Sequence, residues 1–385
     1  MTRIRLLFLA NGVGAAVLGP FSAVILAGRG FDAAGIGLLS AMCSVAFVLS
    51  ISGWGHLADV VLGRARALRA AILGAAAFVI VFFLPVPPIL VGAAFVAYWA
   101  CFGAVGPLSD ALAVNAMRDP GREYGRVRGL ASASFAVSVV GLGLIYARTG
   151  YDAVGVLFVA VSLLVAVVAG RVPDLRRATL TVQRRGGAIR EVLALQPGLP
   201  KILLAVGLAY FGVFAGFTFL SLRIVELGGG PLEVALSAAI AAAAEVGAMV
   251  GAGRLLPRFG ARGVFAGSAL VYIVAMVLWI VLGSSVAIIA SRLISGAGYS
   301  GLWIATIMTV RRLLPPALQG SGQALISMTT TGGAAFMANV VGGLLYAQGG
   351  HAALYGVAIV VTGAGGLLGW FVLPGVEPQA ASGVS

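Results

Sequence analysis

The chain has 385 residues, of which 61% are hydrophobic and only 10% are charged, and its mean hydropathy is +1.08. A soluble domain of this size could not cover so much apolar surface, whereas the hydrocarbon of a bilayer would solvate it. The net charge of +13 would suggest a nucleic-acid ligand in a soluble protein, but the placement of the basic residues along this chain explains the charge differently.

Apolar runs of about 20 residues predict twelve membrane-spanning helices. The first run does not indicate a cleaved signal peptide, because an equally hydrophobic chain follows it. The predicted fold is therefore an all-α membrane protein. In chain order the predicted spans are residues 4–27, 34–56, 68–86, 88–114, 127–147, 152–170, 201–225, 232–256, 262–283, 285–310, 321–347 and 351–373.

The basic residues predict the orientation of these spans. All but four of the 25 lie at the N-terminus or in and beside the gaps that follow even-numbered spans; the exceptions are Arg29, Arg148, Arg223 and Arg292. An excess of Arg and Lys marks cytoplasmic loops, so we expect an inner-membrane protein with both termini in the cytoplasm and no nucleic-acid partner. Arg292, near the outer end of span ten, is expected to extend toward the membrane interface.

A polar segment, residues 171–200, separates spans six and seven. It predicts an N-terminal six-helix bundle (1–170), a central cytoplasmic loop (171–200), and a C-terminal six-helix bundle with a short cytoplasmic tail (201–385). The gaps after the second span of each half correspond, since Gly55 and Gly253 stand 198 residues apart. Two six-helix halves with corresponding loops are typical of internally duplicated transporters.

These paired loops resemble the signature loop of the major facilitator superfamily, G-x-x-x-D-R-x-G-R-[RK]. The first copy keeps Gly55 and Asp59, and the second has Pro257 at the position of the acid. Together with the twelve spans, the resemblance covers the whole chain and implies two bundles that alternate around a central site. It also implies a cytoplasmic gate, although the same residues could simply form tight turns. The candidate gating residues are Gly55, Asp59, Arg64, Gly253, Arg258 and Arg262.

One acid lies deep in a predicted span. A charged residue at the centre of a membrane helix costs about 2.5–3.5 kcal/mol, so its presence indicates a task or a partner. Glu245 lies thirteen residues into span eight, with no basic residue within eight positions on either side. We interpret it as a substrate or proton site, the alternative being an acid that hydrogen-bonds a neighbouring helix.

Asp110 and Arg128 form a second candidate site. They lie at the end of span four and the start of span five, and antiparallel helices can bring them face to face. A salt bridge that only holds the hairpin is the alternative. The surrounding residues resemble the lactose and phenylpropionate permease branch of the superfamily, where an acid and an arginine at this spacing of eighteen positions bind substrate. That resemblance implies substrate binding by Asp110, Arg128 and Glu245.

The resemblance also bears on coupling. The branch carries a histidine on span ten, and this chain has none there, so Glu245 is the first candidate for carrying a proton and Asp110 the second. The sequence contains no P-loop, metal-ligand cluster or cofactor motif. We therefore expect a monomeric secondary transporter that moves a small solute across the bilayer by proton symport. Drug or sugar efflux by antiport is the main alternative.

Two other classes of protein are alternatives. Gly298 to Gly301 reads G-x-S-G, the nucleophile motif of rhomboid intramembrane proteases, with His351 as a nominal base. A membrane sensor without transport activity is the other possibility. Twelve spans in two halves do not suit the protease, and a sensor would be expected to carry a sizeable soluble output segment. The chain is therefore predicted not to be an enzyme.

Overall fold

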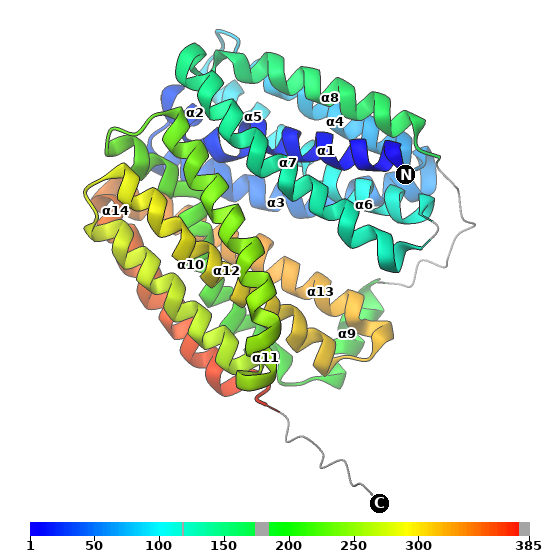
Figure 1. Cartoon of the computed structure of the whole chain (residues 1–385), viewed down its shortest axis with the longest axis vertical. Helices are drawn as coiled ribbons and strands as arrows, with labels where there is room; N and C mark the ends of the chain where they lie inside the picture. The colour runs from blue at the N-terminus through cyan, green and yellow to red at the C-terminus, as the bar shows by residue number, and fades with distance from the viewer. Residues whose placement is uncertain (118, 174–184, 377–385) are drawn as a thin grey trace, which may run out of the picture.

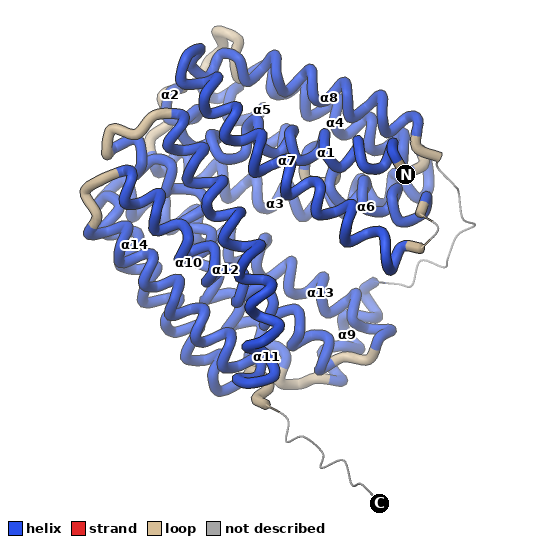
Figure 2. Tube along the Cα trace, in the orientation of Figure 1, coloured by secondary structure: helices blue, strands red, loops and turns tan. Residues whose placement is uncertain are grey.

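The computed structural model describes residues 1–117, 119–173 and 185–376, and within them all regular structure is helical, with no strand (Figure 2). Helices satisfy every backbone N–H and C=O within one segment, as a chain in hydrocarbon requires. Of the predicted central loop and tail, residues 174–184 and 377–385 lie outside the described part.

The first half of the chain forms a bundle in which α1 packs on α7 and α8, while α4 packs on α5 and α8 (Figure 1). A short 3-10 turn joins α1 to α2, so that these two together form one span. The helices are α1 (Thr2–Leu18), α2 (Ser22–Gly28), α3 (Ala33–Leu57), α4 (Arg64–Val81), α5 (Pro88–Phe102), α6 (Val105–Ala116), α7 (Pro120–Thr149) and α8 (Ala153–Arg171).

The second half forms another bundle, in which α10 packs on α14 and α11 packs on α12. Two of its helices are each a pair of rods, because the backbone reverses inside α11 at Gly260 and inside α14 at Gly350. The helices are α9 (Arg185–Leu195), α10 (Leu199–Glu226), α11 (Pro231–Val281), α12 (Ser285–Leu313), α13 (Gln319–Ser327) and α14 (Ala335–Val372).

The described helices agree with the twelve predicted spans. Nine helical stretches are long and apolar enough to cross a bilayer, and two of them reverse direction, at Gly150 and at Gly350. Helix α4, which carries Arg64, Arg66 and Arg69, packs alongside α5 and α8 as a further rod. The apolar runs were therefore sufficient to locate the helices.

The internal duplication is visible in the backbone. The glycines with positive φ form three pairs, separated by 198, 197 and 200 residues: Gly30 with Gly228, Gly63 with Gly260, and Gly150 with Gly350. Each member of a pair lies where one helix turns into the next, a conformation that glycine adopts without a steric penalty. Gly55 and Gly253, singled out in the sequence, lie within α3 and α11 instead. The turns that follow them are made by Gly63 and Gly260.

The two bundles contact each other at the end opposite the chain termini. Gly37 of α3 lies against the backbone of Gly343 in α14, and Gly143 of α7 lies against Ala235 in α11. All four residues are close to the reversals that include Gly150 and Gly350. In Figure 1 the bundles converge near α2 and the upper end of α14 and diverge toward α6 and α13. The glycines permit this approach because a Cβ at Gly37 or Gly143 would collide with the facing helix.

One polar side chain links the bundles. Asn339 of α14 is 4% exposed and donates through Nδ2 to the Ser44 hydroxyl of α3 at 3.4 Å. Its Oδ1 accepts a hydrogen bond from Thr218 of α10 at 2.6 Å. The buried amide therefore has partners on both of its polar atoms, as a group removed from water needs. This contact adds to the glycine contacts that hold the bundles together at this end.

Candidate functional site

Arg292 is buried in the C-terminal bundle. Its side chain is on α12, and the residue is only 7% exposed. Nη1 donates to the Ser295 hydroxyl at 2.9 Å, Nε donates to the Ser237 carbonyl at 3.4 Å, and the guanidinium lies 5.8 Å from the centre of the Trp279 ring. The prediction that Arg292 extends to the membrane interface is therefore wrong. Partners from α11 and α12 satisfy the cation inside the bundle.

Glu245 and Arg292 line one narrow pocket, which is closed to a molecule the size of water in this conformation. The pocket lies between α10, α11 and α12, and its other lining residues are Phe217, Tyr272, Ser295, Gly296 and Tyr299. The Glu245 carboxylate is within electrostatic range of the guanidinium, but the two form no ion pair within 4.0 Å in the described structure. An unpaired carboxylate thus faces a buried cation inside an apolar bundle.

Aromatic rings extend from this pocket along α10 and α12. The ring centres of Phe217 and Tyr299 are 5.6 Å apart, and Tyr299 stacks on Trp303 at 6.5 Å. Tyr210 lies 6.3 Å from Tyr299 and 6.4 Å from Phe214. Phe217 is 48% exposed, so the row is not a closed core. Flat rings beside charged groups are suited to the faces of a cyclic, hydroxylated ligand.

The hairpin between α6 and α7 brings Asp110 and Arg128 together. Their side chains approach to 4.0 Å, between Oδ1 and Nη1, with 29% of Asp110 and 53% of Arg128 exposed. Tyr124 of α7 lies beside the Asp110 carboxylate. The predicted proximity is therefore present, as a loose and partly exposed pair. Its geometry leaves donors of the Arg128 guanidinium available to a ligand.

Two acceptor atoms at this site, one of them the Asp110 oxygen of the pair, accept no hydrogen bond. Asn11 of α1 donates to the Ser109 hydroxyl at 2.8 Å, but its Oδ1 is buried and accepts no hydrogen bond. The Oδ1 atom of Asp110 is likewise buried and accepts none. Buried polar atoms in folded proteins are rarely left without a partner, so each exception calls for an explanation. Acceptors in this state are suited to the hydroxyl groups of a ligand.

The two signature loops differ in their contacts. In the first loop, Arg64 and Asp59 approach to 3.6 Å around the turn at Gly63. In the second, the Arg258 guanidinium lies 5.5 Å from the Phe259 ring centre, and that of Arg262 lies 5.3 Å from the Trp370 ring centre. Within the described residues, neither of these two arginines forms an ion pair.

The G-x-S-G motif does not form a catalytic dyad. Ser300 of α12 donates to the backbone carbonyl of Glu245 at 3.1 Å. His351 lies beyond the reversal in α14, where its Nδ1 is 3.9 Å from Glu226. The nominal nucleophile and base therefore belong to separate clusters within the described structure.

Sequence reasoning missed Arg292 as a site residue. The residue lies seven positions into α12, or about 10 Å along the helix axis, which is deep for a side chain expected to reach the interface. The isolated acid Glu245 also needed a compensating group. Depth and the need for a counter-charge were the signals that could have identified the pair.

Two bundles of long apolar helices, with charged side chains held inside them, define a membrane transporter of the major facilitator type. The chain belongs to the MFS_1 like family, whose profile matches residues 3–357. It is 28% identical over 330 residues to the maltose permease of Geobacillus stearothermophilus, covering 84% of this chain and 81% of that protein. These relatives are transporters, so the chain is not an enzyme.

Solved structures share the fold. A mutant form of the nucleoside transporter NupG superposes with a TM-score of 0.75 at 16% identity, covering 96% of this chain and 98% of that one. A bacterial homologue of the iron transporter ferroportin, solved in an inward-facing state, has a TM-score of 0.76 at 14% identity, covering 96% of this chain and 97% of that one. At these identities the likeness concerns the fold alone.

Proposed function

We propose that this protein carries a small hydroxylated solute, a saccharide or a nucleoside, across the inner membrane by alternating access coupled to protons. The observation that carries the proposal is the Glu245 carboxylate, which faces buried Arg292 without pairing to it, beside a row of aromatic rings. Because a charged side chain inside a membrane bundle costs free energy, its presence indicates a role in solute binding or in proton coupling.

The polar groups are suited to a hydroxylated solute. Arg128 offers several donors, while the buried oxygens of Asn11 and Asp110 offer acceptors that have no donor of their own. A sugar hydroxyl both donates and accepts, so it matches both kinds of group. The relative named as a maltose permease supports this solute class, because maltose carries several hydroxyls on its rings.

Glu245 is proposed as the proton carrier. When the carboxylate is neutral, Arg292 keeps its charge and its hydrogen bonds to Ser295 and Ser237. When it is ionised, α11 and α12 are proposed to move so that the acid comes within ion-pair distance of the guanidinium. Binding and release of a proton would therefore change the packing of the two helices that line the pocket, which couples protonation to the transport cycle.

The conformation supports a site open toward the termini. The contacts of Gly37 with Gly343 and of Ser44 with Asn339 lie toward the opposite end of the bundles. Since the excess of basic residues predicts cytoplasmic termini, this is proposed to be the inward-facing state. Return to the outward-facing state would separate those contacts and bring together the loops containing Asp59, Arg64, Arg258 and Arg262, which are proposed to form the gate.

Uptake into proteoliposomes tests the proposal. We expect purified protein to accumulate labelled maltose or uridine when an inward proton gradient is imposed, and not when the gradient is collapsed. Glu245→Gln resembles the protonated acid, so we expect it to exchange solute across the membrane but not to accumulate it. Glu191→Gln, at an exposed position on α9, is the control and should accumulate solute normally. Accumulation by Glu245→Gln at the rate of the parent would contradict the assignment.

A further inference from the structure

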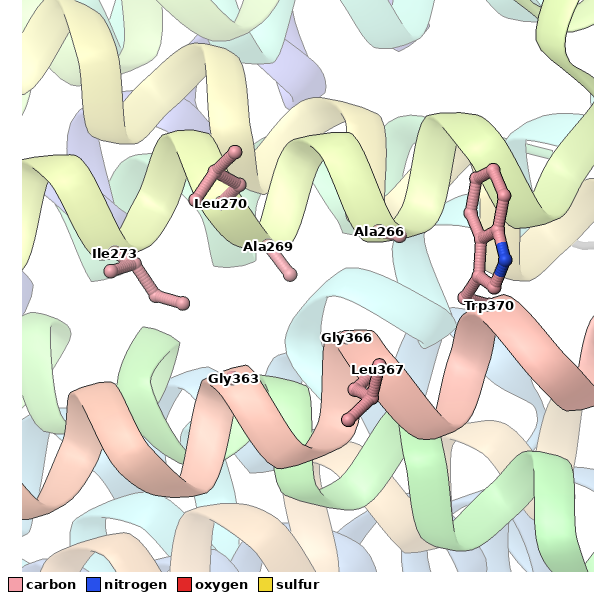
Figure 3. Close-up of a pocket in the computed structure, with 8 residues that line it drawn as sticks. All are labelled: Ala266, Ala269, Leu270, Ile273, Gly363, Gly366, Leu367 and Trp370. Carbon is pink, nitrogen blue, oxygen red and sulfur yellow. The ribbon is translucent and has the colours of Figure 1, made fainter.

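An apolar groove lies between the second rods of α11 and α14. It has a volume of about 440 Å³, and Figure 3 shows it bounded by Ala269, Leu270 and Ile273 on one side and Gly363, Leu367 and Trp370 on the other. Leu270 is 62% exposed and Leu367 is 63% exposed, so the rim faces the surroundings of the bundle. In a membrane protein those surroundings are lipid.

One end of this groove is basic. Trp370 closes that end, and the Arg262 guanidinium lies 5.3 Å from the centre of its ring. Arg262 is exposed, and its backbone N–H donates to the Pro374 carbonyl at 3.1 Å, which fixes the start of the rod beside the chain that follows α14. Arg258, one turn earlier, is exposed as well. The groove therefore combines apolar walls with a cationic mouth.

Among the residues that the structure describes, no acid pairs with this cation, and the internal repeat offers a reason. At the spacing of Gly55 and Gly253, Pro257 corresponds to Asp59, and an arginine follows the turn glycine in each copy: Arg64 after Gly63 and Arg262 after Gly260. In the first copy, the acid and the arginine approach to 3.6 Å. In the second, proline stands in place of the acid, and the arginine turns to Trp370 at the mouth of the groove.

We infer that the groove binds one anionic phospholipid, with an acyl chain along the apolar walls and the phosphate at Arg262. Between Ile273 and Ala266 the groove follows α11 for about 10 Å, most of the hydrocarbon depth of one leaflet. Trp rings favour the level of the lipid headgroups, and basic pockets between membrane helices bind anionic headgroups. The phosphate takes the place that Asp59 has in the first copy.

Other occupants fit less well. A polypeptide segment in this groove would leave backbone groups without partners, because the walls offer no polar side chain apart from the Trp370 indole. A two-fold contact with a second copy would bring two Arg262 side chains of like charge to the same interface. A neutral lipid would fill the walls but would leave the guanidinium without an anion. Net negative charge on the headgroup is thus the property to test.

Native mass spectrometry of the delipidated protein tests the assignment. The ligands are dioleoyl phosphatidylglycerol, dioleoyl phosphatidylcholine and glycerol phosphate at matched concentrations. We expect the parent to retain one phosphatidylglycerol in preference to the other two. Arg262→Gln should lower its affinity about fivefold, as expected for one arginine near a charged membrane surface. Arg311→Gln, an exposed arginine at the end of α12, is the matched control and should leave retention unchanged.

A second pair of variants tests the walls. A side chain at Gly363 would contact Ile273 and fill the groove, whereas one at Gly267 on the same bundle meets nothing within 4 Å. We therefore expect Gly363→Leu to abolish retention of phosphatidylglycerol and Gly267→Leu to preserve it. Thermal unfolding of each variant checks that it is folded.

Tryptophan fluorescence tests whether the lipid occupies the groove without any substitution that fills it. Phosphatidylglycerol with brominated chains should quench the parent, and Trp370→Phe should remove the lipid-specific part of that quenching, since Trp370 borders the groove. The inference is overturned if the parent retains phosphatidylcholine, or binds glycerol phosphate, as well as it retains phosphatidylglycerol. It is overturned too if Arg262→Gln retains as much phosphatidylglycerol as Arg311→Gln does. It is also overturned if Gly363→Leu behaves like Gly267→Leu, or if Trp370→Phe is quenched as strongly as the parent.

Discussion

Arg128 and Arg292 show how the surroundings of an arginine decide its use. Arg292 is 7% exposed, and its donors are directed to Ser295 and Ser237. The side chain of Arg128 is 53% exposed, and the Asp110 carboxylate with which it pairs is 4.0 Å away. The Arg292 guanidinium joins α11 to α12 through two of its donors. A guanidinium with donors to spare can bind a ligand.

The proposed role of Arg128 predicts the effect of a conservative change. Arg128→Lys keeps the charge but loses the planar fork of donors, so it should weaken solute binding about tenfold, the loss of roughly 1.4 kcal/mol of hydrogen bonding. The measurement is a binding titration with whichever of maltose or uridine the protein accumulates. Arg126→Lys, at an exposed position of the same helix, should bind normally. Normal binding by Arg128→Lys would make the Asp110 pair a structural bridge.

At the scale of the helices, the turn after α3 depends on one glycine. Gly63 has φ 81° and ψ 157°, a conformation in which a side chain is strained, and it is the N-cap of α4. Gly55 lies inside α3 with open space where a Cβ would be. The helix extends beyond Gly55 because a π-helical stretch, Ala58–Leu62, continues it to the turn.

This difference predicts opposite effects of the same substitution. Gly63→Ala should destabilise the protein by about 1–3 kcal/mol, because alanine is strained at this φ. Gly55→Ala should be neutral or stabilising by up to about 1 kcal/mol, because alanine favours the helix. Unfolding of the two variants, followed by circular dichroism in detergent, measures both effects. A greater loss in Gly55→Ala would place the essential glycine where the sequence motif did.

The Asp59–Arg64 pair allows gating to be separated from stability. With 57% of the Asp59 side chain exposed, Asp59→Asn should change the free energy of unfolding by less than about 1 kcal/mol. If the loop closes the gate, the variant should nevertheless cycle more slowly and label more readily at cysteines on the terminus side. Uptake rates measure the cycling, and thiol labelling measures the access to those cysteines. Asp152→Asn, on the opposite side, is the control for both. Unchanged uptake and labelling would reduce Asp59 to a turn residue.

Across the whole molecule, all the contacts described between the bundles lie toward one end. Gly37 with Gly343 and Gly143 with Ala235 are approaches between helices that belong to different bundles. Because each pair lets two helices pack closely without side chains between them, separating them exposes little surface beyond the backbone. Such contacts are suited to an interface that opens and closes while each bundle keeps its own core.

The orientation of this assembly is testable in intact cells. The free cysteines Cys43 and Cys101 are first replaced by serine, and single cysteines are then introduced at Asp152 or Arg190, both exposed. A membrane-impermeant thiol reagent should label position 152 from outside and should reach position 190 only after the cells are opened. Labelling of position 190 in intact cells would invert the proposed topology.

The sequence by itself determined the helices and one of the charged pairs. Apolar runs of about 20 residues located the spans, because the thickness of the bilayer sets their length. The short connection between α6 and α7 made Asp110 and Arg128 neighbours, since adjacent antiparallel helices meet. The repeat was also readable, although its turns lie at Gly63 and Gly260 rather than at Gly55 and Gly253.

Only the tertiary structure decided which helix faces meet. Arg292 is buried because two helix faces meet: the face of α11 that carries Ser237 and Glu245, and the face of α12 that carries Ser295. Arg262 lies on Trp370 because the second rods of α11 and α14 are adjacent, although the two residues are far apart in sequence. The length of an apolar run gives neither the rotation of a helix nor its tilt, which follow from packing against neighbouring helices.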